Sequence, residues 1–189
     1  NIPPENILAI TFTNVAVKEM EERFSSVFGE ELAKKITFRT IHSLAYDIYA
    51  ETCDIYAKSC NCDSTKVRKK NIDSTEQKSV IRNLYMKITN EDVHETDILD
   101  LLAAISYSIN MCYKKEDRLN LDETFPFFSK VYSSYVDYKK KNYVMDFDDQ
   151  LFFALYILTK EKKIADEYRA KYKYICVDEA QDTSKIQHK

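Results

Sequence analysis

Two adjacent carboxylates follow an apolar run near the end of the sequence. Ile175-Cys176-Val177 has the composition of a strand and leads directly into Asp178 and Glu179. In open parallel sheets, ligands bind beyond the carboxyl ends of the strands. An aspartate there can hold Mg²⁺ on a nucleotide, and the next glutamate can orient or deprotonate an attacking water. The pair therefore predicts a metal-nucleotide site, with a solvated acidic turn as the alternative.

The composition limits what else the chain can contain. Its 189 residues include a single glycine, Gly29, and three prolines. Neither G-x-x-x-x-G-K-[ST] nor G-x-G-x-x-G can be written with one glycine, so these residues hold no complete phosphate-cradling loop of either kind. The scarcity of turn residues also argues against sandwiches, barrels and propellers. Because 28 Lys+Arg nearly balance 31 Asp+Glu, any binding of nucleic acid must come from a local patch.

Strands and helices alternate in the first 50 residues. Residues 7–12 form a continuous apolar run typical of a buried parallel strand, and Thr13 and Asn14 can cap the helix that follows. Residues 36–41 have the composition of a second strand, which again leads into a helix. Together with the strand expected at residues 172–177, this order predicts an α/β fold whose parallel sheet is built from both ends of the chain.

Between these ends the pattern changes to helices only. Residues 51–72 are polar and contain cysteines, and five apolar stripes at helical spacing follow them. Residues 74–77, Ser-Thr-Glu-Gln, form a capping box that begins the first of these helices. The sequence therefore predicts a mostly helical protein with one α/β domain from residues 1–50 and 171–189 and a large all-α insertion at residues 51–170.

The cysteines and the longest apolar run indicate where such a protein acts. Five cysteines without the spacing of a disulfide framework favour a reduced, cytosolic protein. Cys53, Cys60 and Cys62 could hold a metal, but their spacing is wrong for a zinc knuckle, and thiols in a polar loop are the alternative. The longest apolar run, residues 151–158, is too short to span a membrane. A chain that begins at Asn1 without a signal peptide is expected to be part of a longer one.

Four segments resemble motifs of the UvrD/Rep-type superfamily 1 DNA helicases, in the family's order. Residues 178–183 resemble motif II, and residues 11–23 resemble motif Ia. Residues 40–43 resemble the single-strand-binding motif that follows, and residues 145–151 are similar to an acidic-aromatic segment ahead of motif II. The resemblance covers nearly the whole chain. It implies that the two ends belong to the RecA-like domain 1A and that the insertion is the helical domain 1B.

The resemblance also implies an activity. Asp178 would hold the Mg²⁺ of MgATP, Glu179 would activate the hydrolytic water, and Gln181 would sense the γ-phosphate. The parent protein would be an ATP-dependent DNA helicase that translocates 3′-to-5′ on single-stranded DNA and unwinds duplex at a junction, in repair, replication or recombination. Because the family's Walker A loop and motifs III to VI are not among these residues, the fragment alone is expected to be inactive and not to bind ATP tightly.

A DNA site is implied at the ends of the first two strands. Phe12, Thr13 and Asn14 would contact single-stranded DNA through the ring and through hydrogen bonds to phosphate. Thr40 and His42 would do the same from the second strand. Aromatic rings give stacking that tolerates any base, and hydroxyl and amide groups suit phosphate oxygens.

Two short basic runs bear on the same question. Residues 66–70 and 139–141 could follow the DNA backbone, since domain 1B of the family lies against nucleic acid. Short basic runs are also common on solvated surfaces, and the sequence leaves both interpretations open.

Three other functions are compatible with parts of the sequence: a helicase–nuclease subunit of the AddA/RecB type, a metal-dependent nuclease, and a non-catalytic DNA-binding module. The nuclease would need a two-metal site built from acidic residues. The candidates for that site are Asp146, Asp148, Asp149, Asp178 and Glu179. The first three also stand at the expected start of a helix, where acidic residues interact favourably with the helix dipole.

Overall fold

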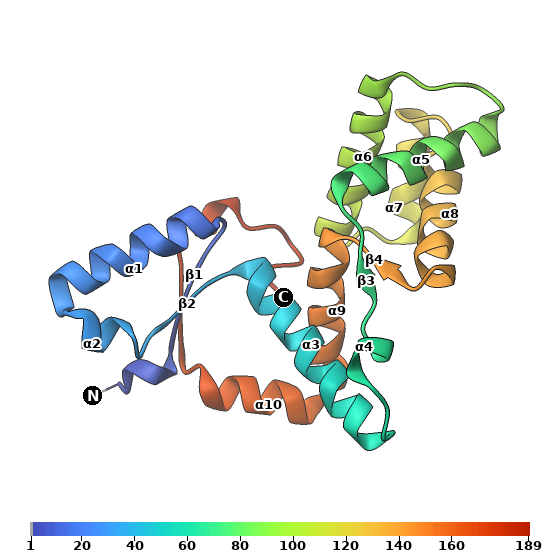
Figure 1. The fold of residues 1–189 in the computed structure, drawn as a ribbon. Coiled ribbons are helices and arrows are strands. Elements are labelled where there is room, and N and C mark those ends of the chain that lie inside the picture. Colours follow the sequence, from blue (N-terminus) through green and yellow to red (C-terminus); the bar gives the residue numbers. More distant parts are fainter. Residues whose placement is uncertain (1) are drawn as a thin grey trace. The chain divides into compact units, whose positions relative to one another are not determined.

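The computed structural model describes residues 2–189, and its Cα positions divide into two compact units (Figure 1). One unit, here the sheet unit, contains the residues up to Cys62 and Phe153–Thr183; the other, here the helical unit, contains Asp63–Phe152 and Ser184–Lys189. The chain passes between the units three times, once within helix α9 (Phe147–Lys160).

The sheet unit is built around parallel strands in the order β2-β1-β5. Residues near both ends of the chain supply these strands, as the sequence predicts. Leu8, Ala9 and Ile10 of the central strand are buried, whereas every residue of the edge strand β5 is exposed. The elements are η1 (Pro4–Asn6), β1 (Ile7–Thr11), α1 (Asn14–Phe28), α2 (Glu30–Ala33), β2 (Thr37–Thr40), α3 (Ile41–Ser59), α10 (Lys162–Lys171), β5 (Tyr174–Val177) and η3 (Ala180–Asp182).

Helix α3 runs nine residues beyond the end predicted for it. The sequence suggests a polar segment from residue 51, but Ala50, Cys53 and Ala57 are buried. Their spacing of three and four continues the inward face of the helix, and small residues there carry little hydropathy signal. The prediction of a loop over residues 51–59 is therefore wrong.

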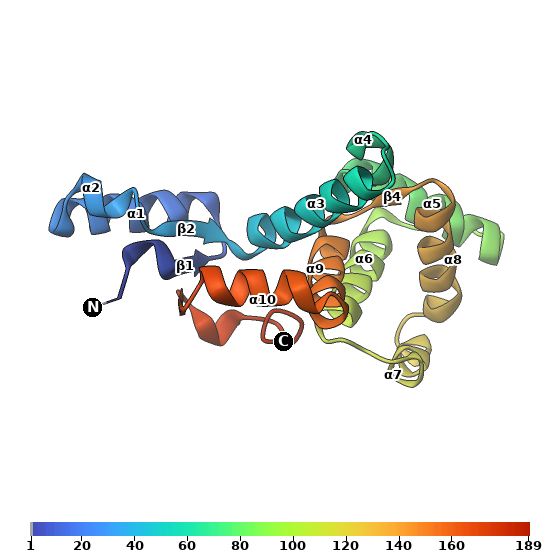
Figure 2. The ribbon, with the colours of Figure 1, turned by 90° about the horizontal axis from the view of Figure 1, so that it is seen from below.

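The helical unit has a hydrophobic core of its own. Helix α5 packs against α6 and α8, as Figures 1 and 2 show, and Ile81, Ile98, Phe128 and Val131 are among the fully buried residues between them. Its elements are α4 (Ser64–Val67), β3 (Lys70–Asn71), α5 (Ser74–Thr89), α6 (Glu95–Asn110), α7 (Lys115–Asn120), η2 (Leu121–Glu123), α8 (Phe128–Lys141), β4 (Val144–Met145) and the first part of α9.

Two details of this unit differ from the sequence prediction. Asp73, rather than Ser74, caps α5, because its carboxylate accepts the N–H of Glu76 at 2.8 Å. The parallel strands β3 and β4 pair Lys70 with Val144, and the pattern of apolar stripes predicts neither strand. At two residues each, they are too short for an alternating pattern to be seen.

The α/β class and the mostly helical character are confirmed. The boundaries of the compact units, after residues 62, 152 and 183, differ from those of the predicted domains, after residues 50 and 170. Among the described helices, none is long and apolar enough to cross a membrane.

Candidate functional site

The ends of the three parallel strands meet at one edge of the sheet unit. Thr11 of β1 lies level with Thr40 of β2, and Ile10 lies level with Val177 of β5. The N–H of Asp178 continues the ladder by donating to the carbonyl of Ile10 at 2.8 Å. Parallel strands place their carboxyl ends together, so the acidic pair and the two predicted DNA-contacting segments emerge from the same edge.

An exposed turn carries the acidic pair. Both side chains are exposed, and within the part of the chain that the structure describes no hydrogen bond or ion pair holds the carboxylate of Asp178. Glu179 adopts a left-handed backbone conformation with φ of 50°, which non-glycine residues rarely occupy and which is concentrated at functional sites. Gln181 donates to the Glu179 carboxylate, and the N–H of Asp182 donates to the Glu179 carbonyl at 2.9 Å. We name residues 178–183 the acidic turn.

The acidic turn offers the one or two carboxylates that a protein usually supplies to Mg²⁺. Magnesium is usually held by one or two carboxylates together with waters and substrate phosphates, not by a complete protein cage. Asp178 meets that condition because its carboxylate is exposed at the strand end. Within residues 2–189, no group of three or more acidic, histidine or cysteine side chains is placed to hold a metal ion.

At the end of β1, a half-buried ring precedes two exposed polar residues. Phe12 is partly covered, whereas Thr13 and Asn14 face solvent. The Thr13 hydroxyl accepts the N–H of Ala16 at 3.1 Å and so caps α1. A helix N-terminus with exposed hydroxyl and amide groups is a suitable partner for a phosphate.

At the end of β2, the two predicted residues are more enclosed. Thr40 is buried, and its hydroxyl accepts the N–H of Ser43 at 3.1 Å, which caps α3. Burial lowers the pKa of His42 to about 4, so its imidazole is neutral at pH 7. Any contact of His42 with a phosphate therefore comes from a neutral N–H rather than from a cation.

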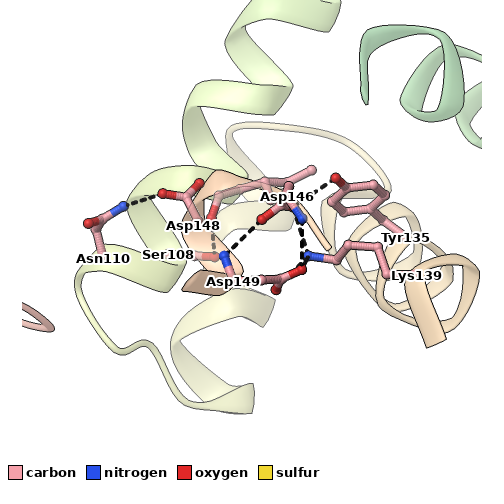
Figure 3. Close-up of polar contacts among 8 residues, drawn as sticks. Ser108, Asn110, Tyr135, Lys139, Asp146, Asp148 and Asp149 are labelled. Carbon is pink, nitrogen blue, oxygen red and sulfur yellow. Dashed lines mark hydrogen bonds and ion pairs between the residues drawn. The ribbon is translucent and has the colours of Figure 1, made fainter. Parts of the chain in front are cut away.

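The second acidic segment is accounted for by a buried lysine (Figure 3). Lys139 Nζ lies 2.8 Å from Asp146 Oδ2 and 2.8 Å from the Asp149 carboxylate. The Tyr135 hydroxyl donates to the same Asp146 oxygen at 2.7 Å. Burial opposes the charge of Lys139, but its attraction to Asp146 and Asp149 outweighs that penalty and raises its pKa. The lysine is therefore a buried cation.

Asp146 and Asp149 also close the start of α9. The N–H of Asp149 donates to Asp146 Oδ1 at 2.9 Å, and the N–H of Asp146 donates to Asp149 Oδ2 at 3.1 Å. Asp146 therefore caps this helix, at the position where the sequence favours acidic residues for the helix dipole. With Lys139 between them, these carboxylates are held in a structural cluster, and the alternative of a two-metal nuclease site loses its basis.

The basic run at residues 139–141 is thus partly buried and partly exposed. Lys139 is 4% exposed, so the prediction that it contacts DNA or solvent is wrong. Phe128, Val131 and Tyr135 lead to Lys139 at spacings of three and four, so the lysine continues a buried stripe. That spacing is the sequence signal that could have identified Lys139 as a buried residue. Lys140 and Lys141 are exposed.

The other basic run and the cysteines add no comparable cluster. Lys70 lies 3.8 Å from Glu76, and burial lowers the pKa of Lys69. Cys53 is buried in α3, whereas Cys60 and Cys62 are exposed, and all three are free thiols. The prediction that Cys53 lies in a polar loop is therefore wrong, because the residue belongs to the buried face of α3.

Comparison with known proteins supplies the family. The model of the UvrD/REP helicase N-terminal domain matches residues 1–189. The chain is 34% identical over its whole length to the ATP-dependent DNA helicase PcrA of Staphylococcus epidermidis and 32% identical to PcrA of Staphylococcus aureus. It spans about a quarter of the length of these relatives, 25% in each case. The chain belongs to the UvrD/Rep helicase family.

Proposed function

We propose that this chain is the part of an ATP-dependent DNA helicase that joins the ATP site to a single-strand DNA site. The observation that carries the proposal is the common edge of the sheet unit, where the acidic turn and the ends of β1 and β2 emerge together. Matching relatives are named ATP-dependent DNA helicases, which supports the same activity here. The proposed protein moves 3′-to-5′ and unwinds duplex in the cytoplasm during repair, replication or recombination.

In the proposed ATP site, Asp178 holds Mg²⁺ and Glu179 takes the proton of the attacking water. The metal, when bound, neutralises charge that develops on the phosphates. Glu179 is suited to its role because its exposed carboxylate leaves the strand directly after Asp178. Gln181 donates to that carboxylate, so it can orient the base and respond to the phosphate next to it. With one glycine in the chain, the phosphate-cradling loop must lie outside these residues.

In the proposed DNA site, the end of β1 makes the principal contacts. Phe12 offers a ring for base stacking, and Thr13 and Asn14 offer polar groups and the N-terminus of α1 to a phosphate. Thr40 and His42 extend the site along β2. Because His42 is neutral, its contact with a phosphate should make the affinity for DNA less dependent on salt than a contact from a lysine would.

In domain terms, we propose that residues 1–50 and 171–189 belong to domain 1A and residues 51–170 to domain 1B. The separate hydrophobic core of the helical unit supports an inserted domain that folds around its own helices. The exposed Lys140 and Lys141 are the residues of the basic run that remain available to a DNA backbone.

The test is Glu179→Gln in the protein that carries these residues at its full length. Loss of a positioned general base is expected to reduce ATP turnover about 10²- to 10⁴-fold. Binding of MgATP is expected to persist, since the amide keeps the shape of the side chain and Asp178 is intact. Glu167→Gln, on the exposed surface of α10, is the matched control and should leave both quantities unchanged.

Steady-state hydrolysis and calorimetric titration with a non-hydrolysable ATP analogue measure the two quantities. Equal losses of binding and turnover would contradict the role of Glu179 as a base and make it a ligand or a structural residue.

A further inference from the structure

Helix α3 ends at two exposed thiols, which we name the thiol pair. Cys60 directly follows the last residue of the helix, Ser59, and Cys62 lies two residues after Cys60. Both side chains are exposed, both are free thiols, and both belong to the sheet unit. The proposed function uses neither of them. The thiol pair is accordingly a candidate for chemistry separate from that of the ATP and DNA sites.

Backbone hydrogen bonds hold the residue between the two thiols in a left-handed conformation. Asn61 has a φ of 52°, which asparagine tolerates better than most residues do. Its N–H donates to the carbonyl of Lys58 at 3.3 Å. The N–H of Cys62 donates to the carbonyl of Ala57 at 2.9 Å. These two bonds form the Schellman motif, which ends a helix with one left-handed residue. The helix end therefore fixes the backbone from Cys60 to Cys62.

That conformation sets the distance between the α-carbons of the thiol pair. A left-handed helical residue mirrors a right-handed one, so its two neighbours have the separation of residues i and i+2 in an α-helix. With a rise of about 1.5 Å per residue and a radius of about 2.3 Å, this separation is about 5.4 Å. An extended residue would place the same α-carbons about 6.6–7.2 Å apart. Disulfide-bonded cysteines usually have α-carbons about 4.4–6.8 Å apart, most often near 5.5–6 Å. The left-handed Asn61 thus gives the thiol pair a separation that suits a disulfide.

Exposure makes the thiol pair accessible to small molecules in solution. Exchange between thiols and disulfides requires a thiolate that can reach a disulfide sulfur, so its rate depends on access. Cys53 is buried and Cys112 is partly buried, whereas both members of the thiol pair are exposed. Exposed disulfides are also the labile ones, which a small thiol can reduce again. A bond between Cys60 and Cys62 is therefore expected to be reversible.

We propose that the thiol pair is a dithiol site that small-molecule disulfides of the glutathione class oxidise to an intrachain disulfide. The thiolate of one cysteine attacks the small disulfide, forms a mixed disulfide and releases one small thiolate. The thiolate of the other cysteine then attacks the cysteine sulfur of the mixed disulfide, closes the bond and releases the second small thiolate. The two cysteine protons pass through water to the released thiolates. Two protein thiols are oxidised and one small disulfide is reduced, and an excess of small thiol reverses both steps.

The test places the protein, at its full length, in a buffer of oxidised and reduced glutathione. Acid quenching, alkylation of the remaining thiols and mass spectrometry of tryptic peptides follow. Cleavage after Lys58 and Lys66 gives a peptide of residues 59–66, which contains the thiol pair and no other cysteine. Closure lowers the mass of this peptide by two hydrogen atoms, whereas a mixed disulfide adds one glutathione. Cys176 is the internal control, because it is exposed in β5 and has no cysteine near it in the sequence.

The closed disulfide is expected to be the main oxidised form of residues 59–66, whereas Cys176 should carry the mixed disulfide. Two variants of Asn61, which is itself exposed, test the role of the left-handed residue. Asn61→Val should lower the ratio of closed to mixed disulfide about 5- to 30-fold, because a side chain that is branched at Cβ disfavours this conformation. Asn61→Gly should not lower it, because glycine adopts positive φ freely. Cys60→Ser should leave Cys62 with the mixed disulfide.

Three results would overturn the inference. The first is a mixed disulfide at residues 59–66 without the closed form. The second is no reaction at the thiol pair under conditions in which Cys176 reacts. The third is the same ratio of closed to mixed disulfide in Asn61→Val and Asn61→Gly, which would show that the helix end does not hold the two thiols for closure. None of these measurements depends on ATP or DNA, so their outcome is independent of the proposed function.

Discussion

Replacement of Lys139 by methionine removes one charge from a buried cluster of three. The ammonium lies 2.8 Å from both the Asp146 and the Asp149 carboxylates. Lys139 is 4% exposed and Asp146 is 2% exposed, so water cannot take the place of the lost ammonium. Methionine keeps most of the apolar stem, and the change in stability therefore reports mainly on the unpaired carboxylates.

Removal of one partner from a buried ion pair typically costs about 3–5 kcal/mol. For a chain of 189 residues, that loss corresponds to a decrease in melting temperature of roughly 6–20 °C. Urea unfolding followed by far-ultraviolet circular dichroism measures the loss in the free energy of unfolding. The matched control is Lys140→Met, because Lys140 is the exposed neighbour on the same helix, and a surface change there should stay within about 0.5 kcal/mol.

The pH dependence gives a second check on the same cause. Burial already raises the pKa of Asp149 above the ordinary value of 3.8, and without the ammonium, which lowers it, this pKa should rise further in the folded state only. The folded variant then holds protons that the unfolded chain has released, so its stability falls as the pH rises above 3.8. The deficit of Lys139→Met should be larger at pH 8 than at pH 5, and adding Asp149→Asn should recover part of it. A loss no larger than that of Lys140→Met, or one that does not vary with pH, would refute this reasoning.

Three further measurements test other parts of the structure. Because burial holds the pKa of His42 at about 4, below 6.5, the unfolded chain binds more protons between these values. The free energy of unfolding should therefore rise with pH across that window, by at most about 1.4 kcal/mol per unit, and His42→Gln should flatten the rise in urea titrations. Phe12→Ala should weaken binding of a single-stranded oligonucleotide about 5- to 100-fold in fluorescence anisotropy, whereas Val27→Ala, at an exposed position near the other end of α1, should not. Asp73→Ala should cost about 1 kcal/mol in thermal unfolding through loss of the cap of α5, and Ser74→Ala much less.

Local patterns predicted the sheet unit well, because its signals are short and strong. The apolar run before Thr13 became β1, and the helix after it ends where Gly29 takes a positive φ of 91°. The carboxyl end of the chain joins this sheet as a third strand, which follows from the rule that alternating strands and helices build a parallel sheet. The run of Ala50, Cys53 and Ala57 was missed because small side chains give a weak periodic signal even when they are buried.

The candidate site was predictable in its residues and less so in their surroundings. That Asp178 and Glu179 leave the end of a strand follows from the sequence. The left-handed conformation of Glu179 and the neutral state of His42 do not, because both depend on how the neighbouring elements enclose the backbone and the ring. Likewise, the bond from Ile186 to Asn110 joins positions 76 residues apart, and no local pattern contains it.

The two acidic segments show why charge alone does not identify a site. Asp146 and Asp149 lie in a run that is richer in aspartate than the acidic turn, yet both pair with the Lys139 ammonium, and Asp146 also caps a helix. Asp178 follows a strand whose carboxyl end is open, and no described side chain lies against its carboxylate. In the sequence, the residue that distinguishes a structural acidic cluster from a functional one is the basic partner, not the acids themselves. A lysine in register with the buried stripe of α8 predicts a structural cluster. An acidic pair directly after an apolar strand, with no basic residue at such a spacing, keeps its oxygens available for a metal ion and a substrate.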